Sequence, residues 1–300
     1  MRSGSVKYPH RTGIIIVVCG VLVLSFDALL IRLAGAAAWD VIFWRGAFMA
    51  LSLFLLIGLQ RQKKSIRLFV SFRLAALFTA LLQGIGSALF VLAISSTSVA
   101  NTVVLIATAP LFAAAASHFL LKERVALHTW LACILVVVGV SLVFSGSLDF
   151  SQTMGNLYAL GASMTLGGNL TLLRRHHDMP RIPLVAVSGL ITAAIALPES
   201  APLHLSLHSY TILALMGLVQ MPLALVLVSS GTRYLTSPEV SLFLLLETLL
   251  GPVWVWLMLG ESVTRESLIG GTIILTALLV HGWLDMRLAE GAGGNRKTTG

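Results

Sequence analysis

Residues 98–123 read SVANTVVLIATAPLFAAAASHFLLKE, and residues 236–261 read TSPEVSLFLLLETLLGPVWVWLMLGE. The two stretches correspond at a constant offset of 138 residues, and each passes from a short polar opening through an apolar run to a glutamate, Glu123 or Glu261. Each is then followed by another apolar segment rich in Gly and β-branched residues. A run of about 20 apolar residues is long enough to cross a bilayer as a helix. The repeat therefore predicts a membrane protein built from two related halves.

The composition agrees with a lipid environment. The 300 residues are 57% hydrophobic and 11% charged, whereas soluble domains are roughly 45–50% apolar and about 25% charged. A single core cannot hide so much apolar surface from water, because too many residues stay outside it. Cys19 and Cys133 both lie in apolar runs, so neither a disulfide framework nor a metal site is expected. The net charge of +8 would indicate nucleic acid in a soluble protein, but these charges lie in short loops, so no nucleic-acid partner is expected.

Reading outward from the repeat gives ten apolar runs, and the fold class predicted is an all-α integral membrane protein with ten transmembrane helices. Backbone groups in lipid must be satisfied internally, which excludes open strands. The predicted spans are 13–34, 39–59, 71–95, 99–120, 126–145, 155–173, 181–198, 209–232, 237–259 and 266–285. The predicted organisation is a cytoplasmic N-terminus (1–12), a first five-helix repeat (13–145), a linker (146–154), a second repeat (155–285) and a disordered, Gly-rich cytoplasmic tail (286–300).

The basic residues predict the orientation. Seventeen of the 20 Lys and Arg residues fall on the side of the N-terminus, Arg265 alone falls on the other, and Arg32 and Arg45 lie within helices. Cytoplasmic loops carry the excess of Lys and Arg, so both termini are predicted to be cytoplasmic. A cleaved signal peptide is the alternative for the first run, but that run is long and contains Asp27 and Arg32.

Five spans per repeat, an odd number, place the two halves in opposite orientations. Inverted repeats of this kind are a hallmark of secondary transporters, with substrate near the bilayer midplane and alternating access by rocking of the halves. A channel or a structural membrane protein is the alternative for the same repeat. No phosphate-binding loop and no metalloprotease helix motif is present, so ATP is not expected to drive transport and no enzyme activity is expected.

The ends of the two repeated segments also resemble a known family. The residues that carry the resemblance are Ala109-Pro110 with Leu120–Glu123, Leu246-Glu247-Thr248 with Leu257–Glu261, and Arg45 within Trp44–Ala47. In these features the chain resembles the drug/metabolite transporter superfamily, EamA type, over nearly its whole length. The resemblance implies export or exchange of small metabolites, and the sequence is similar to bacterial exporters of aromatic amino acids. One departure is Thr248, where the family usually has proline; here a proline follows at Pro252.

Ionisable side chains inside a bilayer cost roughly 2.5–3.5 kcal/mol on insertion scales, so each is a functional candidate. Glu247 lies deepest, and Phe243, Glu247 and Trp254 share one face of their helix. A carboxylate between aromatic rings suits a substrate ammonium or ring, although a helix-packing hydrogen bond is the alternative. The other ionisable candidates within predicted spans are Asp27, Arg32, Arg45, His118 and Glu239.

Coupling or gating is assigned to Asp27, Arg45 and Pro110. Asp27 either carries a proton or pairs with Arg32 or Arg45, and Arg45 either attracts an anionic group or pairs with Asp27. Glu239 is interpreted as a helix cap. Pro110 marks a point where a helix can break, which is tolerated beside a cavity.

Neutral polar residues form stripes on several predicted helices. Such stripes either join helices by hydrogen bonds or line a shared polar path. The members assigned to substrate binding are Gln83, Ser87 and Phe90 on the third span, Asn101 and Thr108 on the fourth, Tyr158, Thr165 and Asn169 on the sixth, and Gln220 on the eighth, together with Phe243, Glu247 and Trp254.

The function predicted is a secondary transporter that exports small metabolites, above all aromatic and other neutral amino acids, around a cavity between the halves. The alternative is a proton-coupled multidrug or cation exporter, which Glu247 among aromatic rings would serve equally well. The expected partners are a small-molecule substrate and the lipid bilayer, with no cofactor or metal, in the inner (plasma) membrane as a multi-pass protein.

Overall fold

A computed structural model of the chain gives the arrangement of its helices. The structure describes residues 10–60, 67, 69–109, 111–113, 115–116, 131, 134–136, 138–139, 141–142, 145, 150–176, 178–201, 203–231, 234, 237–261 and 263–294. Within these ranges the regular structure is helical throughout and no strand occurs. Most of the predicted fifth span, 126–145, and the end of the fourth lie outside the described residues.

The helices follow the apolar runs closely. Their bounds are α1 His10–Leu24, α2 Asp27–Ala34, α3 Ala38–Leu59, α5 Arg73–Ser96, α6 Val99–Ile106, α9 Phe150–Arg175, α10 Arg181–Ala196, α11 Leu207–Leu215, a π-helical turn η1 Met216–Gln220, α12 Met221–Gly231, α13 Ser237–Leu259 and α14 Arg265–Gly294. The helices of the described part that are long and apolar enough to cross a membrane are Thr12–Ala34, Ala38–Leu59, Arg73–Ser96 and Leu207–Gly231. Shorter apolar helices occur at Val99–Ala113, Arg181–Ala196, Leu250–Leu259 and Leu268–Ala277.

The first predicted span is broken rather than continuous. α1 ends at Leu24 and α2 begins at Asp27, with Ser25 and Phe26 in a turn between them. The Ser25 hydroxyl donates to the Leu22 carbonyl at 2.7 Å. A serine hydroxyl that bonds the backbone locally offers the chain an alternative to the regular helix. The break puts Asp27 in the first turn of a new helix.

The eighth predicted span also contains an irregularity, the π-helical turn η1. Pro222 follows this turn and has no N–H to donate to the Leu218 carbonyl four residues earlier. The Ser52 hydroxyl of α3 donates to that carbonyl instead, at 2.8 Å. A neighbouring helix thus satisfies the backbone group that the proline leaves open, as irregular helices in membranes require.

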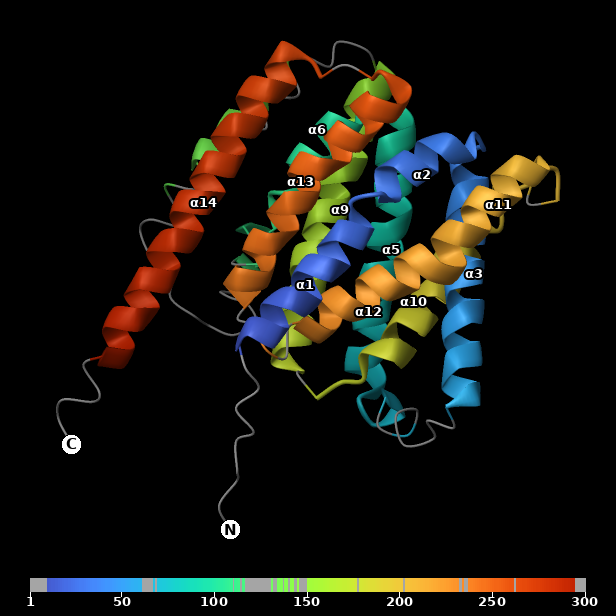
Figure 1. Cartoon of the computed structure of the whole chain (residues 1–300), viewed down its shortest axis with the longest axis horizontal. Helices are drawn as coiled ribbons and strands as arrows, with labels where there is room; N and C mark the ends of the chain where they lie inside the picture. Colours follow the sequence, from blue (N-terminus) through green and yellow to red (C-terminus); the bar gives the residue numbers. More distant parts are fainter. Residues whose placement is uncertain are drawn as a thin grey trace.

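Helices from the two predicted repeats interleave (Figure 1). α1 packs against α12, α3 against α10, α5 against α9, and α6 against α13. The α3–α10 crossing is especially close, because a Cβ atom on Gly46 would lie 2.6 Å from the Gly189 carbonyl oxygen, and one on Gly189 would lie 2.8 Å from that of Gly46. Small residues at such crossings let helix backbones approach without side chains between them.

The structure differs from the sequence prediction at the C-terminal end. α14 continues to Gly294, whereas a disordered tail is predicted from residue 286. Residues 286–290 are Met, Arg, Leu, Ala and Glu, all of them good helix formers, so the helix has no local reason to end near residue 285. α14 lies along one side of the bundle, and the start of α1 and the end of α14 lie at the same end of it (Figure 1).

Candidate functional site

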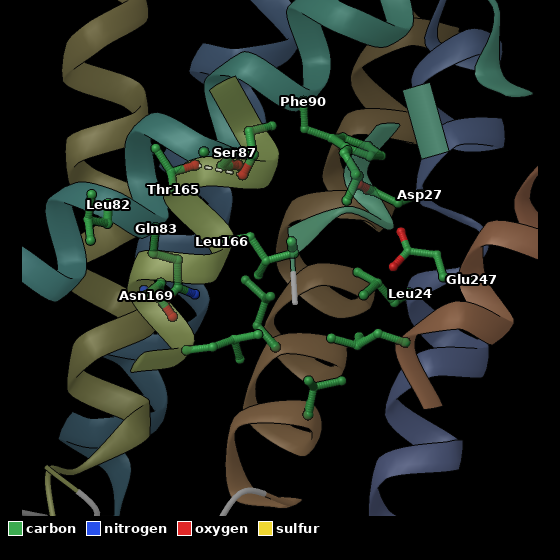
Figure 2. Close-up of a pocket in the computed structure, with 18 of the residues that line it drawn as sticks. Leu24, Asp27, Leu82, Gln83, Ser87, Phe90, Thr165, Leu166, Asn169 and Glu247 are labelled. Atoms are coloured by element: carbon green, nitrogen blue, oxygen red, sulfur yellow. Dashed lines mark hydrogen bonds between the residues drawn. The ribbon is translucent and has the colours of Figure 1, made fainter. Parts of the chain in front are cut away.

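A cavity of about 170 Å³ lies among the helices of both halves. An apolar cavity of roughly 150 Å³ already holds a benzene-sized molecule, so this one is large enough for a small organic ligand. Most of its lining is apolar, with charged and polar side chains on opposite walls (Figure 2). The lining residues used below are Leu24, Asp27, Arg45, Gln83, Ser87, Phe90, Ala162, Thr165, Leu166, Asn169, Met221 and Glu247.

The charged wall is organised around one buried ion pair. Nη2 of Arg45 donates to Oδ2 of Asp27 at 2.7 Å, and the two side chains are 3% and 2% exposed. The same nitrogen lies 3.1 Å from the sulfur of Met221, and the guanidinium lies over the ring of Phe90, 5.7 Å from its centroid. Of the pairings left open by the sequence, the structure selects Asp27 with Arg45.

This ion pair leaves hydrogen-bonding capacity unused. Within the described ranges, Oδ1 of Asp27 and both Nε and Nη1 of Arg45 are buried without a hydrogen-bond partner. Buried polar atoms in native proteins nearly always have a partner, whether protein or water. Glu247 enters the cavity from α13 on the same side as Asp27 (Figure 2). The wall therefore presents a carboxyl group and a guanidinium that a zwitterionic ligand can engage together.

Asp27 enters the cavity directly after the break between α1 and α2, and residues of the second half contact this break. Nε1 of Trp254 on α13 donates to the Ser25 hydroxyl at 3.0 Å, and its ring stacks on Phe26 at 4.9 Å between centroids. The Gln220 side chain at the end of η1 donates to the Val23 carbonyl at 3.0 Å, one of the carbonyls that a helix end leaves without an intrahelical partner. These three contacts hold the broken span in place from the second half of the chain.

The opposite wall is polar and uncharged. It is formed by Gln83 and Ser87 on α5 with Thr165 and Asn169 on α9. The two helices are in contact here, since a Cβ atom on Gly86 would lie 2.5 Å from the Thr165 hydroxyl oxygen.

The α9 side chains of this wall are anchored to the backbone. Thr165 donates to the Ala162 carbonyl at 2.8 Å, and Asn169 donates to the Thr79 carbonyl at 3.0 Å. By contrast, Oε1 of Gln83 and Oγ of Ser87 are buried and have no hydrogen-bond partner among the residues that the structure describes.

Six residues predicted to bind substrate thus surround the cavity, together with Asp27 and Arg45. The remaining predicted residues lie elsewhere. Phe243 packs with Val17, Val21 and Val228 in a separate hydrophobic cluster, and Tyr158 packs against a cluster around Leu105.

Asn101 and Thr108 join helices instead of lining the cavity. Asn101 bonds Thr97, whose hydroxyl in turn bonds Asn156. Thr108 bonds Ser163 of α9 at 2.8 Å.

Gln220 and Trp254 support the broken first span, as described above. The remaining coupling candidate, Pro110, and also His118 lie outside the described residues, as does the side chain of Glu239.

Arg32 pairs with Glu261 and not with Asp27. Its guanidinium donates to the Thr97 carbonyl at 2.9 Å and pairs with Glu261, with Nε and Oε2 3.4 Å apart. Oε1 of Glu261 also accepts from the backbone N–H of Val99 at 3.0 Å. This contact, called the Arg32–Glu261 latch below, joins α2, the start of α6 and the loop after α13, at the end of the bundle away from both termini (Figure 1).

Sequence reasoning missed Ser25 and Met221, which position the charged wall. Neither carries a recognisable signal, because the turn at Ser25 and Phe26 contains no Gly or Pro and methionine is common in any apolar helix. No group of three or more His, Cys, Asp or Glu side chains that could hold a metal ion occurs in the described part of the chain.

Comparison with known proteins gives the family. An uncharacterized transporter, YdfC, from Bacillus subtilis (strain 168) is 24% identical over 176 residues, which cover 56% of this chain and 58% of that protein. This chain thus spans less than two thirds of the length of the Bacillus protein. An uncharacterized transporter of Archaeoglobus fulgidus is 28% identical over 194 residues, 64% of this chain and 70% of that protein.

A solved crystal structure shares the fold over 93% of this chain and 99% of its own, with a TM-score of 0.64 and 18% sequence identity. The EamA-like transporter family matches at residues 11–145 and 153–282, nearly the whole sequence in two successive copies. Because the family model covers nearly the whole sequence, this chain is a member of the EamA-like transporter family.

Proposed function

We propose that this protein is a secondary transporter of the inner (plasma) membrane that exports small zwitterionic metabolites, foremost neutral amino acids with apolar or aromatic side chains. The observation that carries the proposal is the charged wall of the cavity. Arg45 offers two unpartnered N–H-bearing atoms, and Glu247 offers a carboxyl group, beside an otherwise largely apolar space. A substrate carboxylate would bind Arg45 through charge-assisted hydrogen bonds, and its ammonium would face Glu247.

The apolar lining suits the rest of such a molecule. Leu24, Leu166 and Phe90 surround the space between the charged and polar walls, and burying apolar area contributes roughly 25 cal/mol per Å². The guanidinium over the Phe90 ring also keeps the cation in an aromatic environment. Predominantly apolar pockets with a few placed polar groups are the usual form of small-molecule sites.

Alternating access between two inverted five-helix repeats, with ten spans in total and cytoplasmic termini, is the mechanism we propose. The helix pairing supports it. Numbered as predicted spans, the first packs on the eighth and the third on the sixth, while the second packs on the seventh and the fourth on the ninth. Spans five positions apart are counterparts in the two repeats. When each span is replaced by its counterpart, the same set of contacts results, as a two-fold axis between inverted repeats requires.

A proton-coupled exporter of organic cations is the second candidate. It is favoured by the count of charges at the charged wall, where two carboxyl groups, Asp27 and Glu247, face one guanidinium, Arg45. A bound cation would pair with the carboxylate that Arg45 does not neutralise, and protonation of that carboxylate would release it. In this case a zwitterion would have no advantage over an amine.

The proposal is tested by reconstitution in liposomes. Flux of labelled phenylalanine, threonine and a cationic drug is measured with and without a pH gradient, for the parent protein and for Glu247→Gln. The control is Glu199→Gln, which changes an exposed carboxyl group in the same half of the chain. The glutamine keeps the size and hydrogen-bonding shape of Glu247 but cannot pair with an ammonium.

Amino-acid flux that falls at least tenfold in Glu247→Gln and persists in Glu199→Gln supports the zwitterion site, since loss of a charge-assisted contact is typically worth that factor. Flux of the drug alone, driven by the pH gradient, would replace the proposal with the second candidate. Absence of flux for all three compounds would contradict both.

A further inference from the structure

The polar wall facing the charged wall has no role in holding a zwitterionic head group. We infer that Gln83 and Ser87 form a second substrate contact, which selects zwitterions whose apolar body ends in a hydrogen-bond donor, such as a phenol hydroxyl or an indole N–H. This inference rests on the proposed function and adds a determinant of specificity to it.

The first support is the unused hydrogen-bonding capacity of both side chains. Oε1 of Gln83 and Oγ of Ser87 are buried, line the cavity, and have no hydrogen-bond partner within the described ranges. Leaving such an atom unpaired costs free energy comparable to a lost hydrogen bond. The amide oxygen can only accept, so the group that satisfies it must be a donor.

The second support is the contrast with the other side chains of the same wall. Thr165 donates to the Ala162 carbonyl, and Asn169 donates to the Thr79 carbonyl, so both have structural partners on the backbone. Gln83 and Ser87 lie one turn apart on α5, at i and i+4, and face the cavity from the same side of their helix. Both unsatisfied atoms therefore belong to the face of α5 that lines the cavity.

The third support is the position of this pair relative to the charged residues. Gln83 lies on one side of the cavity, and Asp27 and Glu247 lie on the other, with Leu166 between them (Figure 2). A molecule whose head group is held at the charged wall would direct its far end toward α5 and α9. A cavity of about 170 Å³ leaves room for a ring between these two contacts.

The test varies the substrate first, so that it does not depend on any variant folding. Competition against labelled phenylalanine flux in liposomes is measured for phenylalanine and for its 4-hydroxy, 4-amino and 4-methyl derivatives. The 4-methyl compound matches the 4-hydroxy compound in size but has no donor. We expect the 4-hydroxy and 4-amino compounds to compete about fivefold better than the 4-methyl compound, the usual effect of one neutral hydrogen bond.

The same competition series is then run with Gln83→Leu and Ser87→Ala. We expect the preference for donor-bearing compounds to fall toward unity, most in Gln83→Leu. Ser95→Ala is the matched control, because Ser95 is an exposed residue of the same helix. It is expected to keep the preference of the parent.

Two results would overturn the inference while leaving the proposed function intact. One is equal competition by the 4-hydroxy and 4-methyl compounds in the parent, and the other is a preference that survives unchanged in both Gln83→Leu and Ser87→Ala. Phenylalanine flux that is absent altogether, with drug flux present, identifies failure of the proposed function, and the inference falls with it.

Discussion

At the scale of single residues, the energetics of the site depend on the buried pair of Asp27 and Arg45. Taking two charges out of water costs several kcal/mol per ion, and their attraction repays this only with good geometry. The 2.7 Å contact between two side chains that are almost fully buried meets that condition. Replacing one partner alone therefore costs much stability, whereas replacing both partners together costs much less.

A double-mutant cycle on this pair tests that expectation. Asp27→Ala should lower stability by about 3–5 kcal/mol, because it leaves a buried guanidinium without its partner, whereas Asp27→Ala with Arg45→Met should lose much less. The measurement is thermal unfolding in detergent, followed by tryptophan fluorescence. Single-variant effects that simply add in the double variant would show that the two side chains do not stabilise each other.

At the scale of helices, the position of every cavity residue depends on close crossings that only small residues permit. The α3–α10 crossing at Gly46 and Gly189 fixes the helix that carries Arg45. The irregular spans have the same dependence on neighbours, since Ser52 of α3 satisfies the carbonyl that Pro222 leaves open in the eighth span. Helix geometry in this protein is thus set by contacts between spans as much as by propensity within them.

Gly46→Ala is expected to destabilise the protein by about 1–3 kcal/mol, because its methyl group would meet backbone atoms of α10 at 2.6–2.7 Å. Gly58→Ala on the same helix is the control, since nothing lies within 4 Å of its added methyl group. There alanine should be neutral or stabilising by up to about 1 kcal/mol, from its higher helix propensity. Equal melting temperatures for the two variants would argue against the crossing.

At the scale of the whole molecule, the cavity and the Arg32–Glu261 latch lie toward opposite ends of the bundle. The cavity lining follows α9 from Ala162 to Leu173 and α12 from Met221 to Ser229, toward the end of each helix that lies on the side of the chain termini. The latch joins elements at the other end. In the alternating-access mechanism that we propose, this arrangement corresponds to a state closed on the side away from the termini, and opening that side would separate the latch.

Weakening the latch should therefore make the cavity easier to reach from the side away from the termini. With Cys19 and Cys133 replaced by serine and Ala162→Cys as a reporter in the cavity wall, a membrane-impermeant thiol reagent added from that side should react several-fold faster after Glu261→Gln. Glu266→Gln, at an exposed residue of the neighbouring helix, is the control. Labelling rates that match between the two variants would show that the latch does not control access.

The amino-acid sequence alone predicted the membrane class, the helical segments, the duplication, and the short set of ionisable residues from which the charged wall is drawn. These features depend on composition and period, which are local properties of the chain. The helix boundaries predicted from the sequence are close to those of the structure for α3, α5, α10 and α13, where apolar runs end in clear polar signals. The family model matches two successive segments, 11–145 and 153–282, and the exact division into halves stays a prediction.

Which of these residues meet depends on how the helices pack in three dimensions. Periodicity shows that Phe243, Glu247 and Trp254 share a helix face, but not which neighbour each will contact, and the structure directs Phe243 to a separate cluster and Trp254 to the first span. The choice of Arg45 over Arg32 as partner of Asp27 likewise depends on contacts between distant segments. Such contacts are fixed by packing in three dimensions, for which a single sequence carries no periodic signal.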